Sequence, residues 1–129
     1  MDENNYYNFN PALPEPFNVI HPFQLKAVQQ LLSYKIPEEV DAIILFGGSL
    51  ELTCHIFSDL DLYILSEHHD RMEVYEKMHR ICKPLKKRFD ILVSSEADFK
   101  EAVLEFGTVE NRIWNKGIFI YAKKESNIA

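Results

Sequence analysis

The sequence predicts an α+β domain in which helices pack on a mixed β-sheet. Short, continuously apolar runs such as Ala42 to Phe46 (AIILF) are typical of buried strands, and they alternate with segments of helical periodicity. The chain has 129 residues, which is near the usual size of one domain. Its 47% hydrophobic and 26% charged residues are those of an ordinary globular protein. We therefore expect one domain with one hydrophobic core, over residues 21–129.

The N-terminal part of the chain predicts an arm followed by a helix. Residues 1–20 are rich in Asn and Pro and have no hydrophobic period, so we expect a mobile or loosely docked arm. From Pro22 to about Tyr34 the apolar residues recur near helical spacing, and Pro37 follows the end of that pattern. This segment is interpreted as an amphipathic helix that packs on the sheet.

The remaining elements alternate between strand and helix. The first strand stops at Gly47-Gly48, where a turn is expected, and Ser49 is placed to cap a short helix. A long helix is expected to end near Pro84, because proline cannot continue it. After the strand Ala42 to Phe46, the predicted elements are the short helix Leu50 to His55, strand Leu60 to Leu65, helix Glu67 to about Lys86, strand Phe89 to Val93, helix Phe99 to Phe106 and strand Gly117 to Ala122.

Charge and hydropathy exclude several classes of function. The net charge of -6 argues against tight, non-specific binding of nucleic acid, and the one basic run, Lys83 to Arg88, is interpreted as the solvated end of a helix. No apolar run approaches the roughly 18 to 20 residues that span a bilayer, and the polar start lacks the apolar core of a secretory signal. We expect a cytoplasmic protein with no membrane contact. Cys54 and Cys82 form no CxxC pair and are expected to be free thiols.

Three aspartates occupy positions where strands usually carry apolar residues. Asp59 and Asp61 stand two apart at the start of a strand, so their side chains share one face, and Asp90 lies inside another apolar strand. Carboxylates that converge repel one another, and one must take up a proton unless a cation lies between them. The pattern predicts a site for a divalent cation.

Oxygen ligands of this kind suit Mg²⁺ or Mn²⁺, which proteins usually hold with a few carboxylates and the phosphates of a substrate. The Gly47-Gly48-Ser49 turn supplies a complementary feature. Glycines allow the backbone to approach a phosphate closely, and the N–H groups at a helix start attract it. The two features together predict binding of a metal and a phosphorylated ligand.

The ordered set of motifs resembles the minimal nucleotidyltransferases of the DNA polymerase beta superfamily, over about Ile43 to Ala122. The motifs are Gly47-Gly48-Ser49, Ser58-Asp59-Leu60-Asp61-Leu62 and Phe89-Asp90-Ile91-Leu92-Val93. The resemblance implies a polymerase beta-like nucleotidyltransferase fold. It also implies that Gly47, Gly48, Ser49 and Ser58 contact the nucleotide, that Asp59, Asp61 and Asp90 form the metal and catalytic site, and that Asp90 helps to activate the acceptor hydroxyl.

The nucleotide-binding turn departs from the family pattern in two ways. Nine residues, Leu50 to Ser58, separate Ser49 from Asp59, which is one fewer than is common in the family. Aligning Gly48 with the family's serine would restore the spacing, so either residue is a candidate for that role. Glu51 stands where a basic segment is common, and no Lys or Arg occurs between Lys35 and Arg71. The phosphate charge must then be met by metal, by backbone N–H groups, by other parts of the fold or by a partner.

The predicted activity is Mg²⁺- or Mn²⁺-dependent transfer of a nucleoside monophosphate from an NTP, with AMP from ATP favoured, to a hydroxyl of a protein, an RNA or a small molecule. The resemblance further implies an antitoxin whose partner is a small helical ribonuclease of the HEPN type; a homodimer is the other assembly considered. The alternative function is a catalytically weak or inactive module that neutralises such a partner by covering it. A plain structural domain is the third possibility.

Overall fold

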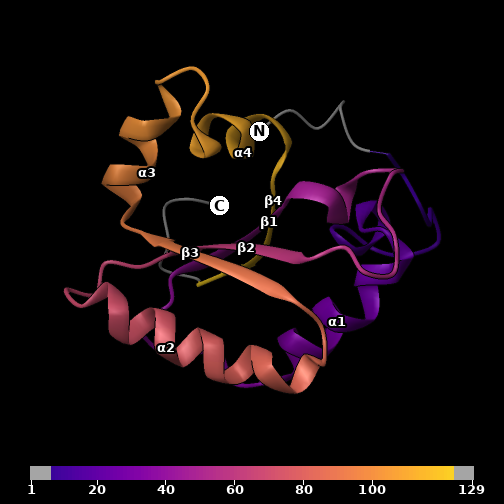
Figure 1. Ribbon diagram of the computed structural model, residues 1–129, viewed down its shortest axis with the longest axis horizontal. Helices are drawn as coiled ribbons and strands as arrows, with labels where there is room; N and C mark the ends of the chain where they lie inside the picture. The colour runs from indigo at the N-terminus through magenta and orange to yellow at the C-terminus, as the bar shows by residue number, and fades with distance from the viewer. Residues whose placement is uncertain (1–6, 124–129) are drawn as a thin grey trace.

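A four-stranded mixed sheet with helices on both faces forms the centre of the protein in the computed structural model, which describes residues 7–123 (Figure 1). The strand order is β3-β2-β1-β4. Strand β1 is antiparallel to both of its neighbours, whereas β2 and β3 are parallel. The predicted mixed sheet is confirmed. The strands are β1 (Ala42–Phe46), β2 (Leu60–Leu65), β3 (Phe89–Ser94) and β4 (Ile118–Ala122).

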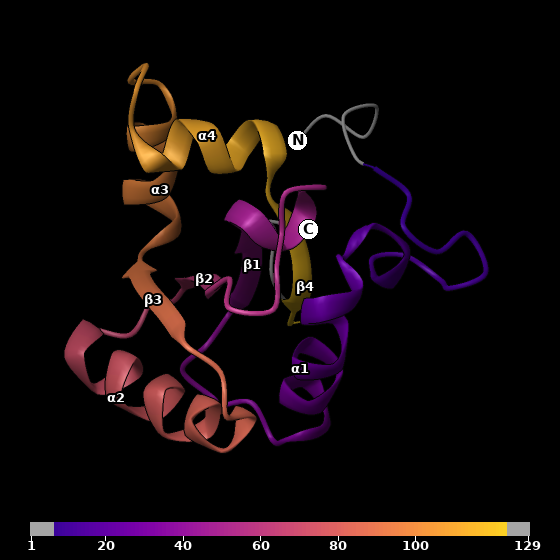
Figure 2. The same cartoon turned by 45° about the vertical axis from the view of Figure 1, so that its right-hand side comes forward.

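The two faces of the sheet bury separate apolar clusters. Leu60, Leu62 and Ile64 of β2 lie in the larger cluster, with side chains from α1 (Pro22–Ser33) and α2 (Arg71–Cys82). Tyr63 and Leu65 lie in the other cluster, with side chains from α3 (Glu96–Val103) and α4 (Val109–Lys116). Figure 2 shows the two helix pairs on opposite sides of the sheet. By alternation along β2, the side chain of Asp61 belongs to the face covered by α3 and α4.

In the second half of the chain, several helices begin or end at other residues than predicted. Helix α2 begins at Arg71 rather than Glu67, because the Asp70 side chain accepts hydrogen bonds from the N–H groups of Met72 and Glu73. It ends at Cys82 and is followed by a 3₁₀ turn, η4 (Lys83–Leu85), which contains the predicted breaker Pro84.

Helix α3 begins three residues before the predicted start, because the Ser95 hydroxyl accepts from the N–H of Asp98. It ends at Val103 rather than Phe106. Helix α4 was not predicted. Thr108 caps its start, and Val109 and Ile113, four residues apart, lie on the side that packs against the second cluster. The signals of a short amphipathic helix were therefore present in the sequence and were missed.

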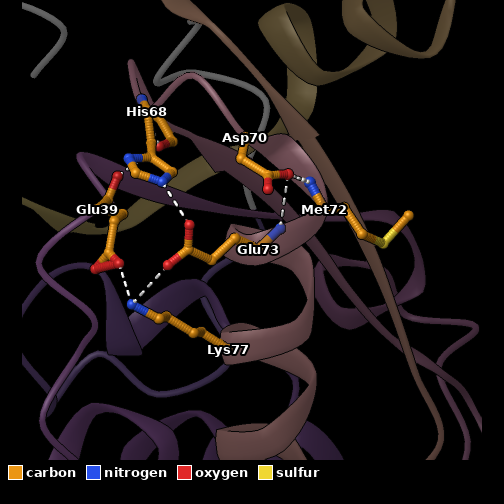
Figure 3. Close-up of polar contacts among 7 residues, drawn as sticks. Glu39, His68, Asp70, Met72, Glu73 and Lys77 are labelled. Atoms are coloured by element: carbon orange, nitrogen blue, oxygen red, sulfur yellow. Dashed lines mark hydrogen bonds and ion pairs between the residues drawn. The ribbon is translucent and has the colours of Figure 1, made fainter.

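A polar cluster attaches α2 to the segment that precedes β1 (Figure 3). The Lys77 ammonium group donates a hydrogen bond to the Glu39 carboxylate and lies 3.4 Å from that of Glu73. His68 Nε2 is 2.7 Å from the same Glu73 side chain. The hydrogen bond from Lys77 lowers the pKa of Glu39, and those from His68 and Lys77 lower the pKa of Glu73. These contacts fix the start of α2 beside the start of β1 and the end of β2.

The part of the predicted N-terminal arm that the structure describes contacts the domain. Ile20 is buried, and Phe17 and Val19 of the short η2 turn (Phe17–Val19) pack against the larger cluster. The ring centroid of Phe9 lies 4.9 Å from that of His21. Residues 1–6 of the arm lie outside the described residues. Among residues 7–123, no helix has the length and apolar character needed to cross a bilayer.

Candidate active site

Two aspartates face each other across the parallel pair of strands. Asp61 and Asp90 are the second residues of β2 and β3 and are register partners. Residues opposite one another in a parallel pair project from the same face of the sheet, so the two carboxylates share the α3/α4 face. The resemblance implied a site that combines Asp90 with Asp59 and Asp61, and the register places Asp90 directly opposite Asp61.

The electrostatics of Asp61 follow from that convergence. Burial, as the main cause, and the negative charges of Asp90 and Asp59 together raise its pKa to about 6. The carboxyl group therefore holds its proton more tightly than an ordinary aspartate in the absence of a cation. A divalent ion between these carboxylates would reverse the effect, because a nearby positive charge favours the ionised form.

Asp59 lies just before β2 and is paired with a cation that sequence reasoning missed. The Arg88 guanidinium Nε lies 3.3 Å from Asp59 Oδ1, and the Arg88 side chain is 84% exposed. The Leu60 N–H donates to the carbonyl of Arg88, which continues the β2–β3 pairing toward these two residues. The signal was present in the sequence, because the spacing from Asp59 to Arg88 equals that from Asp61 to Asp90. The equal spacing predicts that Asp59 and Arg88 are neighbours only if β2 and β3 are known to be parallel and adjacent.

Gly47 closes the site from the end of β1. Its φ is +75°, and a Cβ atom at this position would lie 2.3 Å from Asp61 Oδ2. Residue 47 must therefore be glycine, both for its backbone conformation and for the close approach of the Asp61 carboxylate. A Cβ atom on Gly48, in contrast, would meet nothing within 4 Å.

The predicted serine of the phosphate turn does not face this open space. Ser49 is fully buried, and its hydroxyl is among the buried polar atoms of residues 7–123 that have no hydrogen-bond partner. Its carbonyl accepts a hydrogen bond of 2.8 Å from the N–H of His21. Two residues are candidates for the serine of the resembled family. Position 48 is open but is a glycine, whereas Ser49 has the hydroxyl but is buried.

The short α-helix predicted for Leu50 to His55 was wrong. Residues Gly47–Leu50 form a 3₁₀ turn, η3, without a side-chain cap, and Glu51 is already extended. The chain then follows local turns, in which the Ser58 hydroxyl accepts from the N–H of His55, and His55 Nδ1 accepts from that of Phe57. Side chains that satisfy nearby backbone groups in this way compete with helix formation.

Gln24 holds the backbone in front of the aspartate pair. This buried residue of α1 donates from Nε2 to the carbonyls of Ser58 and Asp59, at 3.0 Å and 3.2 Å. Sequence reasoning missed it, although a glutamine between Phe23 and Leu25 at the start of an amphipathic helix was a weak signal. Gln24 Oε1 is buried without a hydrogen-bond partner in the described part of the chain, so the two bonds from Nε2 are the ones that fix where the Asp59 segment lies.

A pocket of about 790 Å³ opens beside Gly47 and is walled by α4. Arg112 and Lys116 of α4 line it, together with Asn115 and with Glu51 from the segment after η3. These two cations come from the helix that was not predicted. They place positive charge near Gly47, although residues 36–70 contain no Lys or Arg.

The described carboxylates by themselves do not complete a metal site. Among residues 7–123, no group of three or more His, Cys, Asp or Glu side chains is arranged to hold an ion. Mg²⁺ is commonly bound by one or two carboxylates and completed by water and substrate phosphates. The pairing of Asp61 with Asp90, beside a pocket with cationic walls, fits a site that a nucleotide would complete.

Comparison with known proteins supports the fold. The sequence matches no protein-family model and no curated protein. Among solved structures, it is similar to a tri-AMPylated Shewanella oneidensis HEPN toxin in complex with its MNT antitoxin, at 14% identity and a TM-score of 0.50 over 78% of this chain and 73% of that one. The chain has the minimal nucleotidyltransferase fold. The polymerase beta-like architecture predicted from the sequence is thus confirmed.

Two other solved structures have weaker likeness to this nucleotidyltransferase fold. One is a toxin–antitoxin complex with AMP-PNP, at 19% identity and a TM-score of 0.49, covering 77% of this chain and 73% of that one. The other is the MntA–HepT toxin–antitoxin complex, at 18% identity and a TM-score of 0.43, covering 76% and 69%.

Proposed function

We propose that this protein is a nucleotidyltransferase that transfers a nucleoside monophosphate, with AMP from ATP favoured, to an acceptor hydroxyl. The observation that carries the proposal is the parallel register of Asp61 and Asp90, with Gly47 against the Asp61 carboxylate. A strand aspartate with a raised pKa, beside two further carboxylates and a pocket, is typical of a functional site.

Each predicted site residue has a role in the proposal. Asp59, Asp61 and Asp90 would hold Mg²⁺ or Mn²⁺, which would neutralise the phosphates and the leaving pyrophosphate. Gly47 and Gly48 let the backbone approach the triphosphate. Ser49 acts through its place in the turn, since its hydroxyl is buried. A nucleotide contact by Ser58 stays a prediction, because its hydroxyl already accepts a hydrogen bond from His55.

The reaction is an in-line displacement at the α-phosphorus. The acceptor oxygen forms a bond to that phosphorus, the bond to the oxygen that bridges the α- and β-phosphates breaks, and pyrophosphate leaves. Asp90, which is exposed, takes the proton from the acceptor hydroxyl. Arg112 and Lys116 place positive charge on the triphosphate side of the site. Catalysis of this kind consists mainly of positioning and charge neutralisation.

The partner and location form part of the same proposal. A helical HEPN-type ribonuclease is the proposed protein partner, supported by the fold likeness to a chain from a HEPN–MNT complex. A homodimer remains the other assembly, and a cytoplasmic location stays a prediction.

A partner-binding module without catalysis is the second candidate function. It is favoured by exposed apolar side chains between α3 and α4, where Leu104 is 85% and Phe106 98% exposed. Contiguous exposed apolar surface commonly marks a protein interface.

The test is to incubate the purified protein with Mg²⁺ or Mn²⁺, lysate of its host, and ATP labelled at either the α- or the γ-phosphate. Nucleotidyl transfer puts the α-label, and not the γ-label, on a protein or RNA. An Asp59→Asn, Asp61→Asn variant should transfer neither. No transfer of the α-label from ATP, or from GTP, CTP or UTP labelled in the same way, would favour the partner-binding module instead.

A further inference from the structure

A second concave surface lies on the other side of Asp59, between α1, the segment before β2 and the segment that leads into β3. Figure 1 shows the start of β3 beside α1, in agreement with the contacts between α1 and η4. The groove has a volume of about 880 Å³. We call it the basic groove, and its main lining residues are Phe23, Lys26, Phe57, Lys86, Lys87 and Arg88.

The groove concentrates positive charge on an acidic protein. No Asp or Glu is among its lining residues, although the whole chain carries 20 acidic and 14 basic residues. Three of its cations, Lys86 to Arg88, are consecutive, and Lys26 faces them from α1. Residues 84–88 of the run predicted to be a solvated helix end therefore form one wall of the groove. Such a wall suits a ligand with regularly spaced negative charges.

Exposed aromatic rings lie among these cations. The Phe57 side chain is 80% exposed and Phe23 is 52% exposed, and the aliphatic Ile56 beside them is exposed as well. Lys87 Nζ donates to the Ile56 carbonyl at 3.3 Å, which ties the basic wall to the segment that carries Phe57. Cations that follow a backbone and rings on which bases stack are the combination that binds single-stranded nucleic acid.

Lys86, in the wall of the groove, has a backbone conformation that residues with a side chain rarely adopt. Lys86 has a φ of +54°, in the left-handed region, and ends the η4 turn. Glycine or asparagine is the usual residue at such a position. A lysine in this conformation costs backbone strain, and strain of this kind clusters at functional sites.

We propose that the basic groove binds single-stranded nucleic acid, with phosphates at Lys26, Lys86 and Lys87 and bases stacked on Phe23 and Phe57. Ser58, at one end of the groove, directly precedes Asp59, and Arg88 contacts that carboxylate. In this proposal a bound strand extends past Ser58 and Arg88 toward Asp59, and its hydroxyl would be the acceptor. This acceptor role rests on the proposed function, whereas binding in the groove does not.

The test measures fluorescence anisotropy of labelled 12-nucleotide RNA and DNA strands with the full-length protein, without NTP or metal, between 50 and 200 mM salt. Three phosphate contacts predict that log K falls with log salt at a slope of about -2. The double variant Lys86→Gln, Lys87→Gln should reduce this slope to about -0.7. Lys100→Gln on α3, which lies outside the groove, should leave it unchanged. Comparing the affinities of the RNA and DNA strands identifies which nucleic acid the groove prefers.

Two further variants separate binding from folding. Lys86→Gly suits the left-handed backbone, so it should keep or raise the melting temperature and still weaken binding several-fold. Phe57→Ala removes an exposed ring and should weaken single-strand binding about tenfold, in line with the loss of one base–aromatic stack. A blunt duplex should bind more weakly than a single strand, because its bases are not free to stack on the rings.

The proposal is overturned if no strand binds at 50 mM salt, or if affinity is unchanged in all the groove variants. It is also overturned if an acidic peptide of equal charge displaces the strand as well as unlabelled RNA does, which would make the groove a site for a protein segment. Strand binding is measured without NTP or metal, so it does not depend on the transfer reaction. Strand binding without nucleotidyl transfer would therefore contradict the proposed function and leave the groove assignment intact.

Discussion

Gly47 and Asp61 are packed so closely that a Cβ atom on residue 47 would lie 2.3 Å from Asp61 Oδ2. This contact joins the end of β1 to the second residue of β2 and brings the predicted phosphate turn to the carboxylate pair. It leads to a prediction for each partner and for the neighbouring residues of the turn.

Gly47→Ala should destabilise the protein by about 2 kcal/mol or more, because alanine is strained at a φ of +75° and its methyl group would collide with Asp61. Gly48→Ala is the matched control, since its added methyl group would meet nothing within 4 Å. Urea unfolding of both variants measures the difference. Equal stabilities would show that the close contact between Gly47 and Asp61 is absent.

Gly48→Ser should strengthen ATP binding. The position is open, and the substitution would place a hydroxyl where the spacing to Asp59 equals that of the resembled family. One added hydrogen bond to a charged phosphate is worth about 1.5 kcal/mol or more, which corresponds to roughly tenfold in affinity. Calorimetric titration with ATP and Mg²⁺ measures the change. Weaker binding would indicate that backbone access at Gly48, rather than a missing hydroxyl, limits the site.

Asp61 should make the metal-free protein less stable as pH rises. Its folded pKa of about 6 is above its unfolded value of about 3.9, so the stabilising effect of its proton is complete below about pH 4 and is lost as pH rises through 6. Asp61→Asn should remove this dependence and raise stability at pH 7.5 by about 1 to 2 kcal/mol, a figure reduced for partial exposure.

Urea unfolding in EDTA at pH 4.5 and 7.5 measures this effect. Asp98→Asn is the control of opposite sign, because the hydrogen bond from Arg71 lowers the pKa of Asp98, whose stabilising effect is therefore present at neutral pH and lost in acid. An Asp61→Asn variant that is less stable than the natural protein at pH 7.5 would indicate that this carboxylate has a structural role.

Gln24→Leu should lower the rate of nucleotidyl transfer more than it changes the KM for ATP. The substitution leaves the carbonyls of Ser58 and Asp59 without their hydrogen bonds, so the Asp59 segment loses its fixed position. A loss of about 1 to 3 kcal/mol in stability is also expected. Gln30→Leu on the same helix is the control, because that amide contacts Tyr34 and Pro84 instead. Equal rates for the two variants would argue against a positioning role for Gln24.

Arg112→Ala and Lys116→Ala should each raise the KM for ATP by about tenfold, the effect of losing one charge-assisted contact to phosphate. Alanine favours helix, so α4 should be retained. Lys100→Ala on α3 lies outside the pocket and should leave the KM unchanged. Steady-state kinetics at saturating acceptor measure the three values. Unchanged KM values in both α4 variants would place the triphosphate elsewhere.

The strands could be predicted from the sequence because each is a short apolar run bounded by turn residues. The paired aspartates were visible for the same reason, since a charge inside an apolar run is an anomaly that alternation can place on a face. The convergence of Asp61 with Asp90 needed only that their strands be neighbours.

Features that depend on tertiary structure could not be predicted. Helix α4 is amphipathic, but its sequence does not indicate that Arg112 and Lys116 lie beside Gly47, because this depends on how α4 packs on the sheet. The burial of Ser49 depends on how η3 packs, and the basic groove joins Lys26 to residues more than fifty positions away. Periodicity describes only what one segment presents to its surroundings, and it does not indicate which segments meet.

The most direct test of the central claim is Mn²⁺ binding measured by electron paramagnetic resonance in the presence of ATP, because it needs no knowledge of the acceptor. The natural protein should reduce the signal of unbound Mn²⁺ beyond the reduction by ATP alone. Asp61→Asn and Asp90→Asn should abolish this extra uptake, and Asp98→Asn, a control outside the site, should retain it. Equal uptake by all four proteins would contradict the assignment of these carboxylates as a metal–nucleotide site.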